Sequence, residues 1–197
     1  MALAVFESAH VLTASSIRGL PHNSVRECWH GDPLPSPLWW VLAVDPKTLW
    51  FGGSLPGGGR RVPVARPGEY CEGLWQGDVL ELFLKEPRGR YFELNISPEG
   101  AWWAMELSSY RSRVPYLRPP RISHLDAETL DGRWSALVGI ERESLPFDLS
   151  ADSRIHVSGI AHLDATRFIS SRRVPASEPD FHHAEAFDEI RLRTASR

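Results

Sequence analysis

The chain has 197 residues, 42% of them hydrophobic, and a formal net charge of −3. This length can bury one sizeable core, and we expect a single domain over residues 1–197. Because there is no excess of positive charge, we expect neither nucleic acid nor an anionic membrane as a partner.

The first residues contain no recognisable targeting signal. The segment MALAVFESAHVLTASS lacks a basic start, and Glu7 and His10 interrupt it too early for the apolar part of a secretory signal. No later run of 18 apolar residues could span a membrane. We therefore expect a cytoplasmic protein.

Short strand-like runs follow one another along the chain, separated by turn signals such as PSP, DPK, LPGGG, EPRG, SPEG and RPP. This spacing predicts an all-β fold, an antiparallel sandwich or barrel. Segments 55–77 and 109–132 lack a clear period, and we expect long loops there, where binding residues tend to lie. The predicted strands are 3–12, 25–30, 38–44, 48–54, 60–65, 78–85, 90–96, 101–108, 133–142, 153–163, 166–172 and 188–193.

The sequence contains eight tryptophans, an unusually large number for a chain of this length. Tryptophan is often largely buried but keeps one polar atom, so a surplus is typical of a β-core or of a stacking surface for a flat ligand. We expect most of the eight to be buried. Trp75 follows a loop, and it is either a ligand platform or a lid over the edge of the sandwich.

Within residues 77–111 the sequence predicts two hairpins, and along their strands apolar residues alternate with polar ones. A loop over residues 85–89 would place Glu81 opposite Glu93, and a turn from Ser97 to Gly100 would place Asn95 opposite Trp102. One face would then be core, with Leu80, Leu82, Leu84, Phe92, Leu94, Ile96, Trp103, Met105 and Leu107. The other face would carry Glu81, Tyr91, Glu93, Asn95, Trp102 and Glu106.

Two carboxylates directly opposite each other destabilise a sheet, so Glu81 and Glu93 require a compensating partner. An arginine from a neighbouring strand or loop is one candidate: Arg90, Arg111, Arg113 or Arg172. A ligand rich in hydroxyl groups is another, because carboxylates accept several hydrogen bonds and the amide of Asn95 both donates and accepts. A bound cation is the third.

Three segments, LWQGDVLELFL, YFELNISPEGAWW and EPDFHHAEAFDEIRL, resemble family 9 carbohydrate-binding modules and the wider DOMON-like group, over about residues 70–193. The resemblance implies a β-sandwich whose sugar lies between two aromatic rings and bonds to carboxylate and amide side chains. It implies Trp75 as one ring, Phe181 near the second ring, and Glu81 and Asn95 as polar contacts on the floor of one small pocket. The candidate ligand-binding residues are Trp75, Glu81, Glu93, Asn95, Trp102 and Phe181.

We interpret the chain as a non-catalytic module that binds a mono- or oligosaccharide. A glycosidase that uses Glu81 and Glu93 stays open, since adjacent strands lie about 4.8 Å apart. A haem or redox module also stays open, since some DOMON-like proteins bind haem through Met and His, and here Met105 is the internal methionine. A sandwich that binds no small ligand is the last alternative.

Other reactive side chains favour structural roles. Cys28 and Cys71 lie far apart outside any CxxC pattern, which favours buried free thiols. The acidic and histidine cluster at 180–185 matches no established metal spacing, so we expect a hydrogen-bonded loop there. Ser170 and Ser171, with His156 or His162, lack a nucleophile elbow. We expect no cofactor, and a structural calcium ion remains open.

Overall fold

The computed structural model describes residues 3–115 and 118–195. In these residues thirteen strands form one continuous hydrogen-bonded sheet. The strands are β1 (Leu3–Glu7), β2 (Asn23–Glu27), β3 (Pro33–Val44), β4 (Thr48–Pro56), β5 (Val79–Lys85), β6 (Tyr91–Ile96), β7 (Trp102–Ser109), β8 (Ser112–Arg113), β9 (Ile122–Leu130), β10 (Arg133–Glu141), β11 (Arg154–His162), β12 (Thr166–Ser170) and β13 (Asp188–Thr194). The helices are α1 (Ala14–Arg18) and the one-turn 3-10 helices η1 (Leu74–Gln76), η2 (Arg142–Ser144) and η3 (Ala184–Ala186).

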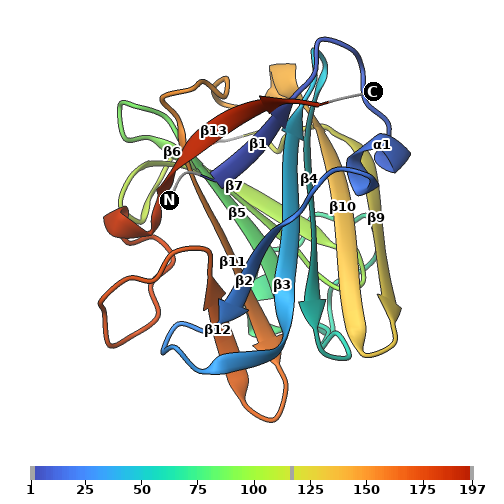
Figure 1. Ribbon diagram of the computed structural model, residues 1–197, viewed down its shortest axis with the longest axis vertical. Coiled ribbons are helices and arrows are strands. Elements are labelled where there is room, and N and C mark those ends of the chain that lie inside the picture. The colour runs from blue at the N-terminus through green and yellow to red at the C-terminus, as the bar shows by residue number, and fades with distance from the viewer. Residues whose placement is uncertain (1–2, 116–117, 196–197) are drawn as a thin grey trace.

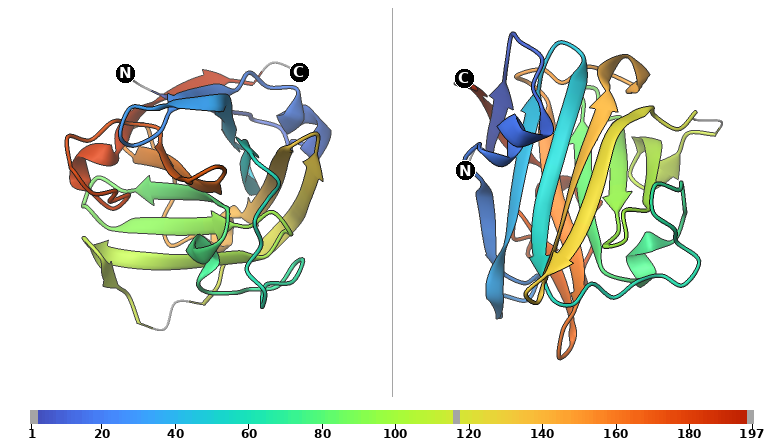
Figure 2. Two further views of the ribbon diagram at one scale, coloured as in Figure 1. Left: turned by 90° about the horizontal axis from the view of Figure 1, so that it is seen from below. Right: turned by 90° about the vertical axis from the view of Figure 1, so that its right-hand side faces the viewer.

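The sheet folds back on itself into two layers. Its order is β8-β7-β6-β5-β11-β13-β1-β3-β4-β10-β9, with β12 beside β11 and β2 beside β3. In Figure 1, β3, β4, β10 and β9 lie toward the viewer and β5–β7 pass behind them, and the end view in Figure 2 shows the sheet curling around its interior. Most neighbouring strands are antiparallel, while β1 is parallel to both β13 and β3. The predicted all-β sandwich is confirmed.

The interior between the two layers is apolar. Leu80, Leu82 and Leu94 of one layer pack in the same buried cluster as Trp40 and Phe51 of the other, and all five are fully buried. Each such side chain contributes on the order of 1.5 to 3 kcal/mol to folding. This alternation of leucines was the strongest sequence signal for the fold.

Two predictions of strand position were wrong. Residues 60–65 form no strand, because Pro63 lacks a backbone donor and the segment instead covers the sheet with Val62 and Ala65. Residues 109–132, predicted as a loop, contain β8 and β9. Strand β9 lies at the edge of the sheet, is paired only with β10 and contains no fully buried residue, so its sequence lacks a continuous apolar face.

The first hairpin differs from its predicted register by two residues. Its loop runs from residue 86 to residue 90 and is closed by a hydrogen bond from the Glu86 N–H to the Arg90 carbonyl at 3.0 Å. Glu81 therefore lies opposite Asn95, and Glu93 lies opposite Phe83. A shift of two keeps every side chain on its predicted face, so Glu81, Glu93 and Asn95 still share one.

The second hairpin differs by one residue, which reverses the faces of β7. Gly100 has a φ of 81° and extends the turn by one residue, so that Ser97 pairs with Ala101. Trp103 then lies opposite Asn95 on the outer face, and Trp102 turns into the interior. The predictions that Trp102 shares a face with Asn95, and that Met105 is a core residue aligned with Phe92, are wrong for this reason.

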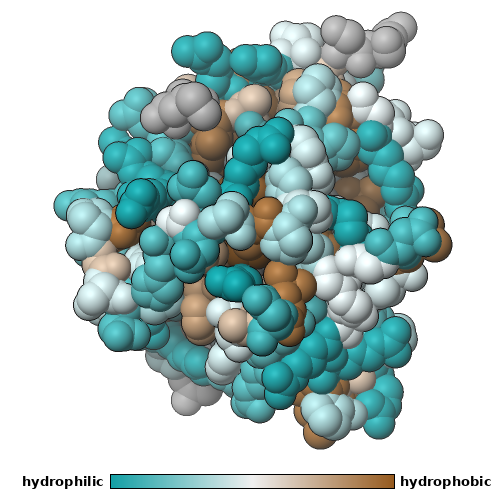
Figure 3. Space-filling model, turned by 60° about the horizontal axis from the view of Figure 1, so that its bottom comes forward, coloured by the Kyte–Doolittle hydropathy of each residue, from teal (hydrophilic) through white to brown (hydrophobic). Residues whose placement is uncertain are grey.

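The surface carries hydrophilic residues over most of the face in Figure 3, where hydrophobic atoms show in separate small areas. None of the helices in the described part of the chain is long and apolar enough to cross a membrane. Both cysteines are free, with Cys28 buried and Cys71 partly buried.

We predict that Gly100→Ala destabilises the fold by about 1 to 2 kcal/mol, because an L-residue in the left-handed region strains the backbone. The site has room for the methyl group, whose nearest neighbour would be Ala127 Cβ at 3.5 Å, so the cost comes from φ and not from a clash. Urea unfolding measures the change. Gly58→Ala is the matched control, since Gly58 has no atom within 4 Å of its Cβ position and no positive φ. Equal shifts in the two variants would contradict this account.

Candidate ligand-binding site

A cavity of about 330 Å³ opens on the outer face of β5, β6, β7 and β11. Loops from three parts of the chain surround it: the β4–β5 loop with η1, the β7–β8 turn and the β12–β13 loop. The residues that line it are Trp75, Glu81, Phe83, Glu93, Trp103, Met105, Leu107, Arg111, Arg113, Ile160, Phe168, Pro179, Phe181 and His182. Its size lies at the lower end of the range for small-ligand sites.

The floor consists of two rows of cross-strand neighbours. The first row runs from Ser158 through Glu81 and Asn95 to Trp103. The second row, one pleat along, contains His156, Phe83, Glu93 and Met105. Because alternate residues of a strand point to the same face, the registers alone bring these side chains together.

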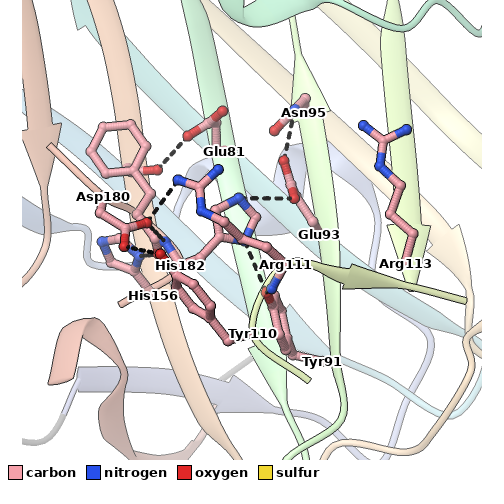
Figure 4. A network of polar contacts seen from close by, with 12 residues as sticks. Glu81, Tyr91, Glu93, Asn95, Tyr110, Arg111, Arg113, His156, Asp180 and His182 are labelled. Atoms are coloured by element: carbon pink, nitrogen blue, oxygen red, sulfur yellow. Dashed lines mark hydrogen bonds and ion pairs between the residues drawn. The ribbon is translucent and has the colours of Figure 1, made fainter. Parts of the chain in front are cut away.

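The two carboxyl groups on the floor are buried, with Glu81 3% and Glu93 4% exposed. Glu81 Oε2 accepts a hydrogen bond from Ser158 Oγ at 2.6 Å, and Glu93 Oε1 accepts one from Asn95 Nδ2 at 3.1 Å (Figure 4). Glu93 Oε2 and Asn95 Oδ1 are buried without a hydrogen-bond partner. The floor therefore presents unsatisfied acceptors.

Burial raises the pKa of both carboxyl groups. Loss of water raises the pKa of Glu81 to about 7, partly offset by the Ser158 hydrogen bond. Loss of water and then the nearby charge of Glu81 raise the pKa of Glu93 to about 8, partly offset by Asn95, Arg113 and Arg111. A raised pKa in a cavity marks carboxyl groups whose charge the protein itself does not fully compensate.

A chain of hydrogen bonds orients His182 toward Glu93. Tyr91 Oη accepts from the Arg111 backbone N–H at 3.0 Å and lies within hydrogen-bond distance of His182 Nδ1, at 2.9 Å. His182 Nε2, on the other side of the ring, faces Glu93 Oε2 at 3.8 Å (Figure 4). That distance is too long for a direct hydrogen bond. Burial lowers the pKa of His182 to about 4, so the ring is neutral at pH 7.

Aromatic rings form the walls. Trp75 is 38% exposed and packs edge-on against Trp103, with ring centroids 5.4 Å apart. Phe181 is 9% exposed and its ring contacts Trp29 at 5.9 Å. His156 lies fully buried beneath it, and His156 Nδ1 is 2.9 Å from the Phe181 carbonyl oxygen, which holds this part of the loop in place.

None of the four candidate arginines forms an ion pair with Glu81 or Glu93. Arg90 pairs with Glu86 and Glu106, and Arg172 pairs with Asp188. Arg111 and Arg113 do line the cavity, but Arg111 bonds to Asp180 at 2.9 Å and Arg113 to Glu72 at 2.7 Å. The compensation predicted from an arginine is therefore not a direct contact in the described residues.

Four of the six candidate binding residues line the cavity: Trp75, Glu81, Glu93 and Phe181. Asn95 lies in the floor, fully buried beside Glu93. Trp102 faces the interior of the sandwich and lies outside the cavity. Whether the five that gather here contact a ligand stays a prediction.

The candidate binding residues predicted from the sequence did not include Trp103, Met105, Arg111, Arg113 and His182, although Arg111 and Arg113 were named as possible partners of the carboxyl pair and Met105 as a possible haem ligand. The first two follow from the extended turn at Gly100, and a glycine directly after a type I turn is a recognisable signal for it. The other three reach the cavity from loops or a two-residue strand, where no periodic pattern exists. Met105 and His182, the residue types of the haem alternative, both line the cavity.

The reactive clusters considered from the sequence have structural contacts. Asp180 bonds to Tyr110 and Arg111 and joins two loops. His183 caps η3. The described residues contain no group of three or more His, Cys, Asp or Glu arranged to hold a metal ion. His156 Nε2 and Ser170 Oγ lie 2.9 Å apart, but His156 is fully buried, so this pair is closed to a substrate.

No protein-family model and no curated protein matches the sequence. Solved structures match the fold over 98% of this chain. A candidate carbohydrate-binding protein from Bacteroides uniformis is 14% identical, with a TM-score of 0.69 over 99% of its own chain. A family 9 carbohydrate-binding module from Caldicellulosiruptor kristjanssonii is 13% identical in its cellotriose complex (TM-score 0.64, 95% of that chain) and 12% in its glucose complex (0.65, 97%).

The chain has the family 9 module fold. The resemblance read from three segments is thus confirmed at the level of fold, and it extends to the amino-terminal third as well.

We predict that the free energy of unfolding falls as the pH rises from about 6.5 to about 8.5. The raised pKa values of Glu81 and Glu93 mean that the folded state keeps protons that the unfolded state has released. Their stabilising contribution is complete below the ordinary pKa of 4.5 and is lost as the pH passes the folded values near 7 and 8. We expect a loss of roughly 1 to 3 kcal/mol in urea unfolding.

The histidines do not contribute to this fall between pH 6.5 and pH 8.5. The lowered pKa values of His156 and His182 change stability in the opposite direction, and only below about pH 6.5. Glu93→Gln should flatten the dependence, since it removes one titrating group and the repulsion on the other. Glu128→Gln, on the exposed edge strand β9, is the control and should keep the wild-type slope. A wild-type slope in Glu93→Gln would show that the carboxyl pair is not its cause.

Proposed function

We propose that the protein binds a mono- or short oligosaccharide in this cavity and does not cleave it. The observation that carries the proposal is the combination of aromatic walls with buried acceptors on the floor. A sugar is amphipathic: its C–H faces pack against rings, and its hydroxyl groups donate to carboxylate and amide oxygens. Structural neighbours described in complex with glucose and cellotriose support this class of ligand.

A second cavity, of about 570 Å³, lies on the outer face of the other layer and includes Trp39. Its carboxylates already have partners: Asp126 bonds to Arg18 at 2.6 Å, and Glu128 accepts from Ser135 Oγ at 3.4 Å. The cavity over β5 and β6 differs because buried oxygens of Glu93 and Asn95 have no partner. Unsatisfied buried acceptors are costly unless a ligand supplies donors, so we place the sugar there.

Binding fits this cavity better than hydrolysis. A glycosidase needs one carboxyl group held protonated as the acid and another held ionised, through environments that differ. Burial raises the pKa of Glu81 and of Glu93 alike, so their environments do not divide these roles. The structural neighbours are described as binding proteins.

A glycan array, followed by calorimetry with any sugar that binds, tests the proposal directly. Glucose and cellotriose are the first ligands to titrate. We expect a Kd of about ten to a few hundred micromolar, because a few rings and solvent-competing hydrogen bonds leave about 5 to 7 kcal/mol. Absence of binding across the array would reject the function. A visible absorption spectrum of the purified protein distinguishes the haem alternative from sugar binding.

We predict that Trp75→Ala abolishes detectable binding of a short oligosaccharide and leaves the melting temperature nearly unchanged. Trp75 is more than one-third exposed, so removing it costs the core little but takes away one wall of the cavity. Calorimetry and thermal unfolding measure the two effects. Trp39→Ala is a matched control, since Trp39 is partly exposed and lies on the other layer. Unchanged affinity in a folded Trp75→Ala protein would remove this ring from the site.

A further inference from the structure

The two carboxyl groups on the cavity floor form no ion pair with an arginine in the described residues. Arg111 and Arg113 are the cations at the rim, and each already bonds to a carboxylate, Asp180 or Glu72. These two pairs sum to no net charge, so no arginine of the lining is left to pair with Glu81 and Glu93 when they ionise. Burial raises the pKa of Glu81 to about 7 and that of Glu93 to about 8, so an ammonium that pairs with them at pH 7 displaces protons from the carboxyl groups. His182, the remaining titratable group on the lining, is neutral at pH 7 because burial lowers its pKa.

The free oxygens on the floor require donors. Glu93 Oε2 and Asn95 Oδ1 have no partner, and Glu81 makes one hydrogen bond, from Ser158, within the described residues. The amide of Asn95 directs its N–H side to Glu93, which leaves its carbonyl oxygen as an acceptor. Glu81 and Glu93 line the cavity, while Asn95 lies fully buried beside Glu93 and does not line it. Glu93 Oε2 is therefore the unpartnered carboxyl oxygen of a lining residue.

We propose, building on the sugar-binding function above, that the preferred ligand is a sugar bearing a protonated amino group, with its ammonium on the floor between Glu81 and Glu93. An ammonium carries three N–H donors and a positive charge, and so donates to both carboxyl groups and compensates their charge together. A neutral hydroxyl supplies one donor and no charge. The rings of Trp75, Trp103 and Phe181 suit either ligand, since aromatic faces attract cations as well as C–H groups.

Calorimetry with D-glucosamine, D-glucose and N-acetyl-D-glucosamine at pH 7 tests this preference on the unmodified protein. The amine of glucosamine resembles an α-amino group, with a pKa of roughly 8, and is mostly protonated at this pH. The acetylated sugar keeps the nitrogen but removes its charge. We expect glucosamine to bind at least about tenfold more tightly than either of the others, as for a gained charge-assisted hydrogen bond.

The variant Glu93→Gln separates charge from shape, because glutamine has nearly the same shape as glutamate without its charge. We expect it to weaken glucosamine binding about tenfold and to change glucose binding less than about threefold. Glu128→Gln should change neither. The comparison of the three sugars does not depend on any variant, so a Glu93→Gln protein that fails to fold leaves the test intact.

The outcomes distinguish this inference from the general function. Glucose binding equal to or tighter than glucosamine binding would overturn the ammonium site and keep the sugar-binding function. Equal losses of affinity for glucosamine and for glucose in Glu93→Gln would also overturn the ammonium site. If none of the three sugars binds, and the glycan array shows no other, both proposals fail.

Discussion

Burial of both faces of β5 and β6 is the constraint on which the site depends. Their inner face packs against β3, β4 and β10 with leucine and phenylalanine, and their outer face lies beneath three loops. A single-sided sheet would leave Glu81 and Glu93 in water, where carboxylates need no partner. Here both are almost completely excluded from solvent, so every polar atom on that face must find a hydrogen bond or carry the cost of lacking one.

The proposed binding of a sugar follows from that cost. A buried carboxylate without a compensating charge is unfavourable by several kcal/mol in low-dielectric surroundings, and taking up a proton is one way to reduce the penalty. A ligand that donates to Glu93 Oε2 and Asn95 Oδ1 is another. The hydrogen bonds from the Arg111 backbone N–H to Tyr91 and between Tyr91 and His182 hold the side chains beside Glu93 in place, and the proposed binding would then need little rearrangement.

The fold was largely predictable, because it rests on a repeated signal. Leucines at 80, 82 and 84 indicated a buried strand without knowledge of its partners, and the same holds for Phe92, Leu94 and Ile96.

The site was predictable only where it depends on the face of the sheet and not on the exact register. Glu81, Glu93 and Asn95 were placed together although their pairing was wrong by two residues. One additional residue at Gly100 was enough to exchange Trp102 for Trp103. Loop residues such as His182 and Arg111 obey no period, and their positions depend on contacts between distant segments, such as Asp180 with Arg111.

Similarity of fold and similarity of ligand depend on different numbers of residues. Alternating apolar side chains define the two layers, and many substitutions preserve that pattern, so the architecture is shared at 12 to 14% identity. The chemistry of the cavity depends on a few side chains whose replacement leaves the core intact. Changing a single floor residue between acid, amide and base alters the charge of the site by one or two units. On a buried cavity floor, such a change affects affinity more than a small change of shape does, because electrostatic interactions are less screened there. The partners of Arg111 and Arg113 therefore matter to the site as well: because these two cations bond to Asp180 and Glu72, neither forms an ion pair with Glu81 or Glu93.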